Sequence, residues 1–337
     1  MATSGTITYR AAGTVLIRQA LLALSAIDQH DTGAPSATQT ADALVMLNML
    51  VKEWEAKGLQ LWETQYGVIF PNPEQTVYVL GSPGPAGDHA CISSPLGFGF
   101  VQTALASDAA ASASTIAVDT LSSDSTTGTS ATTMASGYNI GIVLDSGAIQ
   151  WTTISGAATA ASVPLTVALT SAASEGNYVY SYQTKLIRPL RIVDGFVRQV
   201  SGDNDIPVTI LAREQYNRFG MKSSQGTPIQ LYYDPQENTG HVYIFPTFSN
   251  ANQLLYIQYQ SPIEDFATAS DDFDLPQEWM SALVYNLAIR LAPSYEVSME
   301  KFKQVQVLAE YTYKQLDSWD QEAASVFVQP MTWPYEQ

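Results

Sequence analysis

Basic residues are scarce in this sequence. Its 337 residues include 15 lysines and arginines against 32 aspartates and glutamates, which gives a formal net charge of −17. Such a chain repels polyanions on average, and sequence-specific binding of nucleic acid needs a clustered basic face that neutralises phosphates. The composition therefore disfavours a sequence-specific nucleic-acid-binding protein, although an acidic surface can face DNA without gripping it.

Residues that commonly bind metals or act as nucleophiles are also few. The single cysteine, Cys91, excludes an intramolecular disulfide framework and a thiolate metal cluster within one chain. The three histidines (His30, His89 and His241) are scattered, and the sequence has no P-loop and no G-x-S-x-G motif. His89 precedes Cys91 by two residues, but an isolated thiol is more often inert than catalytic. We expect no catalytic residues, no metal and no cofactor.

Long apolar runs are absent as well. The N-terminal segment has no cationic region leading to a cleavage site, and Arg18 and Gln19 interrupt its apolar run. No uninterrupted apolar run approaches the roughly 18 residues of a membrane-spanning helix. We therefore expect that the protein is synthesised in the cytoplasm and does not associate with a membrane.

Apolar positions at helical spacing predict two helices near the N-terminus. The first, near residues 8–26, places one stripe at Leu16, Ile17, Ala20, Leu21 and Leu24. The second follows a turn at residues 30–36. Ser36 and Gln39 have the spacing of a capping box. The apolar positions of the second helix are Leu44, Leu47, Val51 and Trp54. Together the two helices are expected to form a helical hairpin.

The middle of the chain has the pattern of β-strands. Residues 66–70 and 76–81 are expected to form a pair of strands joined by the turn "PNPEQ". Ala, Ser, Thr and Gly dominate residues 83–184, where β-branched and aromatic runs, with "DSG" as a hairpin turn, predict a small inserted β-domain. Within it, residues 108–114 have the composition of a disordered linker. Residues 185–268 alternate in the manner of a half-buried antiparallel sheet.

Four acidic residues precede the apolar run near residue 280, namely Asp271, Asp272, Asp274 and Glu278. A calcium-binding loop would need a glycine that this segment lacks. Asp274, with Pro276 and Gln277 behind it, instead indicates the capped start of a helix. A second helical pattern runs through residues 295–325, and Pro293 separates the two C-terminal helices.

The combination of these segments resembles the head-to-tail adaptor proteins of short-tailed bacteriophages, also called tail accessory factors or head-completion proteins. The similarity covers residues 8–82 and 185–325, and it is carried by "LIRQALLALSAID", "RPLRIVDGFVRQ", "ILAREQYNRF" and "DFDLPQEWMSALVYNLAIRLAPSY". With the patterns above, it implies an α+β fold in which an N-terminal helical hairpin and C-terminal helices pack as a bundle beside an antiparallel β-sheet region and an inserted small all-β domain. The expected domains are 1–82 (hairpin and first strands), 83–184 (insertion), 185–268 (antiparallel β region), 269–325 (C-terminal helices) and 326–337 (extended docking tail).

The resemblance implies a structural virion protein that is not an enzyme. Such adaptors form a ring, typically of twelve copies, beneath the portal vertex at the head–tail junction, where they extend the DNA channel. The implied partners are the portal protein, the tail nozzle or tail tube protein, further copies of the chain and, through residues 83–184, a tail fibre. DNA would pass through without sequence-specific binding, because a channel lined by carboxylates repels its phosphates.

Two groups of residues are candidates for protein contacts. The C-terminus is aromatic and uncharged until Glu336, and it is expected to dock on the portal through Phe327, Pro330, Trp333 and Tyr335. Basic residues return after residue 184, and four of them are expected at subunit interfaces, namely Arg188, Arg191, Arg213 and Arg218.

Two other classes of function stay open. A carbohydrate-binding or fibre-like surface module of a phage tail would expose aromatic rings on the inserted segment, such as Trp151, Tyr178, Tyr180 and Tyr182. A glycan-hydrolysing enzyme would need a pair of carboxylates, which can be distant in the chain. No particular pair stands out in the sequence.

Overall fold

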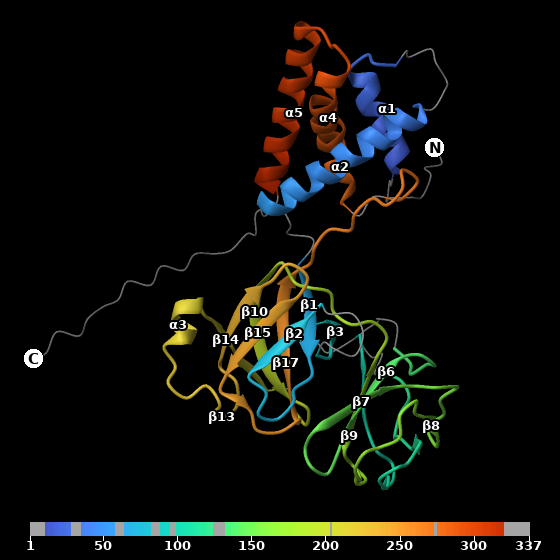
Figure 1. Ribbon diagram of the computed structural model, residues 1–337, viewed down its shortest axis with the longest axis vertical. Helices are drawn as coiled ribbons and strands as arrows, with labels where there is room; N and C mark the ends of the chain where they lie inside the picture. Colours follow the sequence, from blue (N-terminus) through green and yellow to red (C-terminus); the bar gives the residue numbers. More distant parts are fainter. Residues whose placement is uncertain are drawn as a thin grey trace, which may run out of the picture. The chain divides into compact units, whose positions relative to one another are not determined.

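The computed structural model describes residues 11–27, 35–57, 64–81, 88–94, 99–123, 132–202, 204–272 and 275–319. The chain divides into two compact units (Figure 1). Residues 1–62 and 263–337 form the first, which we call the helical unit, and residues 63–262 form the second, the β unit. Both ends of the chain therefore contribute to the helical unit.

The helical unit is organised around α4. Its helices are α1 (Gly13–Ala23), α2 (Ala37–Lys57), α4 (Met280–Leu291) and α5 (Met299–Trp319), and the 3-10 turns η3 (Gln277–Trp279) and η4 (Ala292–Ser294) flank α4. Each of α1, α2 and α5 packs against α4 (Figure 1). Trp54 of α2 and Trp279 are both buried, and their rings meet edge-to-face with centroids 5.4 Å apart. This aromatic contact joins the two ends of the chain inside one core.

The first turn of α1 is capped by backbone from the other end of the chain. The first N–H groups of a helix lack partners within the helix. Gly13 N–H donates to Asp271 O at 3.2 Å, and Thr14 N–H donates to Ala269 O at 2.7 Å. A Cβ at residue 13 would lie 3.1 Å from Ala269 O, so glycine permits this close approach.

The acidic residues before η3 take part in local structure. The Asp271 carboxylate accepts hydrogen bonds from N and Oγ1 of Thr268, both at 2.7 Å. Asp272 forms an antiparallel bridge with Ala12. Asp274, the predicted cap, lies outside the described residues. The Asp271 carboxylate therefore stabilises a turn.

The β unit contains one short helix, α3 (Arg213–Asn217), and, in its described residues, five sheets. The strands are β1 (Thr64–Ile69), β2 (Val77–Leu80), β3 (Ala90–Ser93), β4 (Val101–Ala104), β5 (Thr115–Ile116), β6 (Asn139–Val143), β7 (Ile149–Thr153), β8 (Val163–Pro164), β9 (Tyr178–Tyr182), β10 (Arg191–Gln199), β11 (Asp205–Pro207), β12 (Thr209–Ile210), β13 (Gln225–Gly226), β14 (Gln230–Pro235), β15 (Gly240–Phe245), β16 (Thr247–Phe248) and β17 (Gln253–Gln260). The sheet orders are β11-β10-β17-β1-β3, β12-β14-β15-β2, β4-β9-β6-β7, β5-β8 and β13-β16.

Separate apolar cores fill the β unit. One core takes its side chains from the sheets that contain β17 and β15, and it includes the fully buried Tyr78, Leu231, Val242 and Ile257. Another takes its side chains from the β4-β9-β6-β7 sheet and the β5-β8 ribbon, and its buried members all lie within residues 101–179. A further core joins the two parts, because Phe70 and Leu254 share it with Val143 and Tyr180 of the inserted segment.

The predicted fold class is wrong. The described residues form 17 strands in five sheets and only five α-helices, so β-sheet dominates this α+β protein. α1 and α2 do not form a helical hairpin, because each packs mainly against α4 rather than against the other. Two strand pairs, β12-β14 and β13-β16, are parallel, so the β region is not purely antiparallel.

Two further predictions are also wrong. β1 and β2 do not pair, because β1 lies between β17 and β3 while β2 pairs with β15 in another sheet. Residues 108–114 are not a linker: Ala109 is buried, and its backbone exchanges hydrogen bonds of 2.8 and 2.9 Å with Ala173.

Several local predictions are confirmed. Ser36 N–H donates to Gln39 Oε1 at 2.9 Å, and Gln39 N–H donates to Ser36 Oγ at 3.2 Å, as a capping box requires. The turn that contains "DSG" joins the antiparallel strands β6 and β7, and Gly147 within it has φ +84°. Pro293 lies in η4, between the two C-terminal helices. These features depend on neighbouring residues alone.

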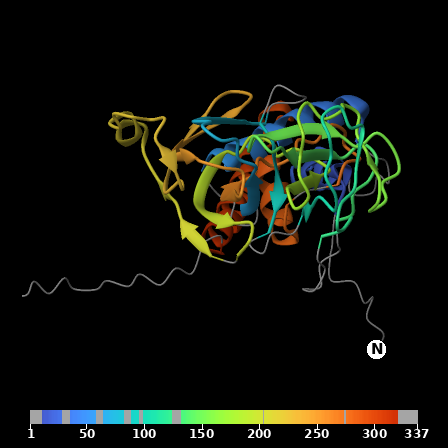
Figure 2. The ribbon, with the colours of Figure 1, turned by 90° about the horizontal axis from the view of Figure 1, so that it is seen from below.

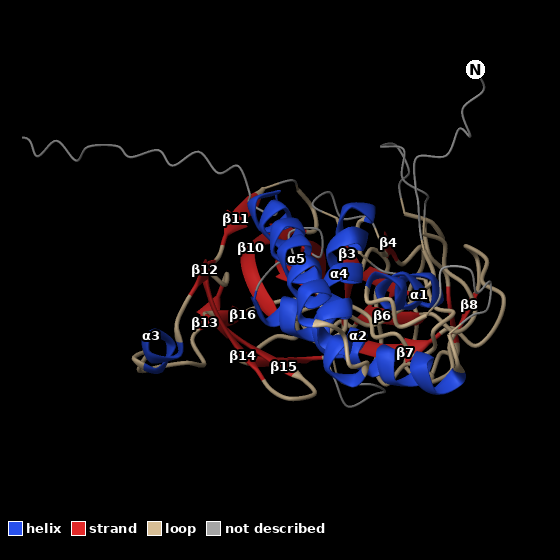
Figure 3. Cartoon of the chain, turned by 90° about the horizontal axis from the view of Figure 1, so that it is seen from above, coloured by secondary structure: helices blue, strands red, loops and turns tan. Residues whose placement is uncertain are grey.

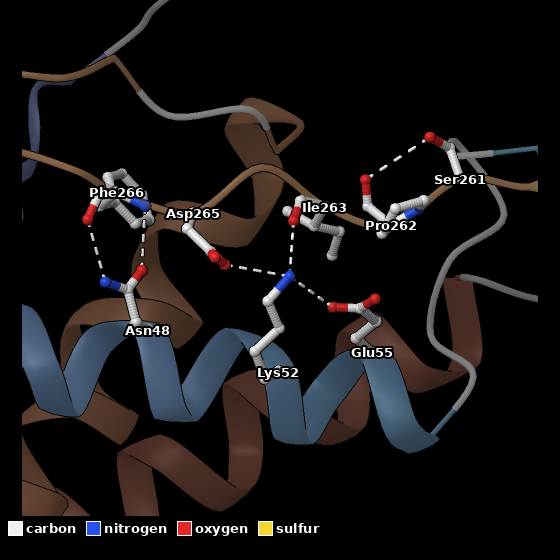
Figure 4. Close-up of polar contacts among 8 residues, drawn as sticks. All are labelled: Asn48, Lys52, Glu55, Ser261, Pro262, Ile263, Asp265 and Phe266. Atoms are coloured by element: carbon white, nitrogen blue, oxygen red, sulfur yellow. Dashed lines mark hydrogen bonds and ion pairs between the residues drawn. The ribbon is translucent and has the colours of Figure 1, made fainter. Parts of the chain in front are cut away.

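α2 holds the segment that leads the chain back into the helical unit (Figure 4). Asn48 Nδ2 donates to Phe266 O and its Oδ1 accepts from Phe266 N–H, both at 3.0 Å. One turn later, Lys52 Nζ donates to Ile263 O at 2.7 Å and lies 3.0 Å from Asp265 Oδ1. Asn48 and Lys52 therefore fix residues 263–266 along one face of α2.

We expect Asn48→Ala to lower the free energy of unfolding of the helical unit by about 1–3 kcal/mol, because the part-buried backbone of Phe266 loses both bonds to the amide. Gln315→Ala, on the exposed surface of α5, is the control and should change it by less than about 0.5 kcal/mol. Urea unfolding followed by circular dichroism measures both, and equal effects would contradict the role of Asn48.

Candidate interaction surfaces

α3 carries two of the four arginines predicted at subunit interfaces. The helix, yellow in Figure 2 and labelled in Figure 3, protrudes on the β14 side of its sheet. Arg213 Nη2 lies 2.5 Å from Asp234 Oδ1, and its Nε donates to Tyr232 Oη at 2.7 Å. Arg218 Nη2 lies 2.5 Å from Glu214 Oε1 on the same exposed stretch. Both guanidinium groups therefore have carboxylate partners within the chain.

Arg188 and Arg191 have different surroundings. Arg191 is exposed at the start of β10, opposite Gln260 of β17. Arg188 is half-buried before β10, and its backbone N lies 2.6 Å from the position of a Cβ at Gly81. Gly81 has φ +79°, so both its backbone conformation and this contact require glycine.

Burial raises the pKa of Tyr233 to about 12, and the charge of Arg188 opposes that shift.

A cleft of about 370 Å³ opens beside α3. Its lining includes Arg213, Tyr216, Lys222, Tyr232, Asp234 and Tyr243. The rings of Tyr232 and Tyr243 are cross-strand neighbours, with centroids 5.5 Å apart. The sequence alone does not reveal this cleft, because its residues are far apart in the chain. They come from α3, from the segment between α3 and β14, and from β14 and β15. The alternation in "HVYIF" placed Tyr243 on one face of its strand but did not show what lies above it.

The aromatic rings of the inserted segment are largely internal. Tyr180 and Tyr182 are fully buried, and Tyr178 is half-buried. The ring of Trp151 stacks on that of His89, with centroids 3.9 Å apart and planes 1° apart. A carbohydrate-binding surface would need these rings exposed, so that interpretation is wrong for Tyr180 and Tyr182.

His89 and Cys91 do not form a nucleophile–base pair. His89 Nδ1 lies 2.6 Å from Tyr182 Oη instead. Burial lowers the pKa of His89 to about 3, and the charge of Lys185 adds to the shift. Burial also raises the pKa of the Cys91 thiol well above its ordinary value. At neutral pH both side chains are uncharged, and Cys91 is a thiol rather than a reactive thiolate.

A groove of about 380 Å³ runs between α2, α4 and α5; we call it the α5 groove. Its apolar lining consists of Leu50, Trp54, Ile289, Phe302, Ala309 and Tyr313. Two basic residues at its rim, Lys57 and Arg290, both donate to the carboxylate of Glu53. Lys57 Nζ also lies 5.3 Å from the centroid of the Tyr313 ring. Glu310 also lines the groove, so two acidic residues balance the two basic ones, and the floor is apolar.

The remaining predicted site residues lie beyond α5. Phe327, Pro330, Trp333 and Tyr335, predicted to dock on the portal, are all outside the described residues. In the part of the chain that the structure describes, no three histidine, cysteine or acidic side chains are grouped so that they could hold a metal ion. A helix with the length and apolarity needed to cross a membrane is likewise absent from those residues.

Comparison with known families identifies the chain. Residues 143–329 match the model of the SU10 adaptor protein family, which is more than half of the sequence. The chain belongs to the SU10 adaptor protein family. It is a phage adaptor-type protein, and this family indicates a structural role in the virion rather than an enzymatic one. A comparison with curated proteins finds no match.

The range of the match differs from the resemblance found in the sequence. It includes all of residues 185–325, but it begins inside the predicted insertion, at β6, and leaves out residues 8–82. The family match in this adaptor protein therefore extends from β6 through α5. It includes α3, the lining of the cleft beside α3 except Thr76 and Val77, and two of the three helices that line the α5 groove.

The buried His89 predicts a pH dependence of stability. Its pKa of about 3 in the fold lies below the unfolded value of roughly 6.5, so the neutral form stabilises the β unit. This stabilisation is complete above about pH 6.5. As the pH falls towards 3, the unfolded state binds a proton that the folded state excludes, so the free energy of unfolding decreases by up to about 1.4 kcal/mol per pH unit. His89→Phe, which keeps a ring against Trp151, should show a shallower loss between pH 6.5 and 4.5 in thermal melts. An equal loss of melting temperature in the variant and the unmodified protein over this pH range would contradict this account.

Proposed function

We propose that this adaptor protein forms a ring, of twelve copies, beneath the portal at the head–tail junction, where it extends the DNA channel and provides the attachment platform for the tail. The observation that carries the proposal is the family match over residues 143–329. The resemblance of residues 8–82 and 185–325 to head-to-tail adaptors of short-tailed phages supports the same role.

The charge of the chain suits a DNA channel. With a net charge of −17 per copy, a ring would bring many carboxylates around its axis. A negative lumen repels phosphates, so the genome can slide through it without binding.

A ring closes through heterologous contacts, in which two different surface patches of each subunit meet. Arg191 is exposed, whereas Arg213 and Arg218 already have carboxylate partners within their own chain. We therefore assign the intersubunit role first to Arg191, with Arg188 beside it in the chain. Their partners would be acidic side chains of the neighbouring copy.

The C-terminal segment and the inserted segment would have separate roles. Residues 326–337 would dock on the portal through their aromatic and proline side chains. Residues 83–184 would form an outward β-domain that decorates the ring or contacts a tail fibre. The buried core within residues 101–179 supports a stable structure for that segment.

The mass of the purified protein with and without portal tests the proposal. We expect either a free ring or a monomer that assembles when portal is added. A monomer whose mass is unaffected by portal would overturn the role at the head–tail junction.

Charge reversal tests the ring interface. Arg191→Glu should prevent assembly of the ring without changing the melting temperature of the subunit, because the residue is exposed and the new charge would face acidic partners. Arg218→Glu is the matched control: it is also exposed and on the β unit, and should leave assembly unchanged. Equal assembly of both variants, measured by light scattering, would contradict the assignment of Arg191.

A further inference from the structure

The α5 groove lacks a covering element among the described residues, although its floor is apolar. Trp54 and Ala309 at its base are almost completely buried, while Phe302 and Tyr313 are half-buried along its wall. At about 380 Å³ the groove is at the small end of the roughly 300–1,000 Å³ typical of ligand sites. Apolar grooves between helices of this kind commonly receive apolar side chains of a peptide segment.

The chain itself supplies such a segment. Residues 320–337 follow directly after α5, and residues 323–335 carry no charged side chain. They include "SVFVQP", in which the three apolar residues 326–328 are followed by a glutamine and a proline. Since Lys57 and Arg290 at the rim already pair with Glu53, an uncharged segment fits this groove better than a charged one.

The reach of the segment agrees with the length of the groove. Tyr313 precedes the end of α5 by six residues, which is about 9 Å along a helix, and Phe302 lies about 16 Å further back. An extended chain covers roughly 3.3 Å per residue. The eight residues 320–327 can therefore turn and bring Phe327 alongside the middle of the groove, near Ala309.

We propose that, in the isolated subunit, residues 323–330 fold back into the α5 groove of their own chain, with Phe327 in contact with its apolar floor. The occupant is the subunit's own segment, because attachment to α5 gives it an effective concentration of the order of mM, far above that of a second copy at micromolar protein. The inference concerns the free subunit and does not depend on the proposed role at the portal.

Cysteine crosslinking tests this placement. Gln304 and Gln306 are both exposed glutamines of α5, but Gln306 lines the α5 groove and Gln304 lines the opposite side, next to α1. With Phe327 left in place, we expect the pair Gln306→Cys/Val328→Cys to form a disulfide within the monomer at least ten times faster than the pair Gln304→Cys/Val328→Cys. The native Cys91 is buried and can be left in place.

Two results would overturn the inference. Equal rates for the two pairs would show that the segment does not prefer the groove. A rate that rises with protein concentration, with the disulfide between two chains, would show that a second copy occupies it. The portal role would be unaffected by either result, because the assembly experiment measures it separately.

A second measurement uses no engineered cysteine. Phe327→Asp in the full chain should raise the hydrogen exchange of the backbone around Phe302 and Tyr313, because a charged side chain cannot be buried on the apolar floor. Gln337→Asp, at the end of the chain, is the control and should leave the exchange unchanged. No difference between Phe327→Asp and the unmodified protein would also overturn the inference.

Discussion

The helical unit depends on one constraint: α4 must be covered by helices from both ends of the chain. Its side chains Leu283 and Leu287 are completely buried, with α1 and α2 on the N-terminal side of the sequence and α5 on the C-terminal side. The β unit occupies the chain between these two ends. The Asn48–Phe266 and Lys52–Ile263 contacts fix the returning chain on α2 before α4 begins.

One edge strand of the β unit, β2, is protected against pairing with other chains. An exposed edge strand offers unpaired backbone groups to other chains. At β2, Gln75 Nε2 donates to Val77 O, Val79 N–H donates to Asp88 Oδ2, and Asp88 N–H donates to Val79 O. The edge is therefore occupied by local side chains and backbone. Such protection limits non-specific strand pairing in a protein that interacts with other phage proteins.

The distribution of charge pairs bears on the proposed contacts between subunits. Arg213 and Arg218 are engaged within the chain, so their predicted role between subunits is weakened in favour of Arg191. The α5 groove, which α2, α4 and α5 line, is a second surface with an apolar floor. A groove covered by the subunit's own C-terminal segment would keep apolar side chains out of water before assembly.

Local features were determined by the sequence itself. The Ser36–Gln39 capping box, the buried stripe of α1 and the turn between β6 and β7 were all predicted correctly, because each depends on residues a few positions apart.

Only the tertiary structure decided which elements meet. A helical period identifies the apolar face of α1 and α2 but not that α4 covers it, and strand patterns placed β1 and β2 next to each other although they lie in different sheets. The burial of Tyr180 and Tyr182, the pairing of Arg213 with Asp234 and the lining of the α5 groove likewise join residues far apart in the sequence. Such contacts depend on the shape and volume of the complete core, which local patterns do not encode.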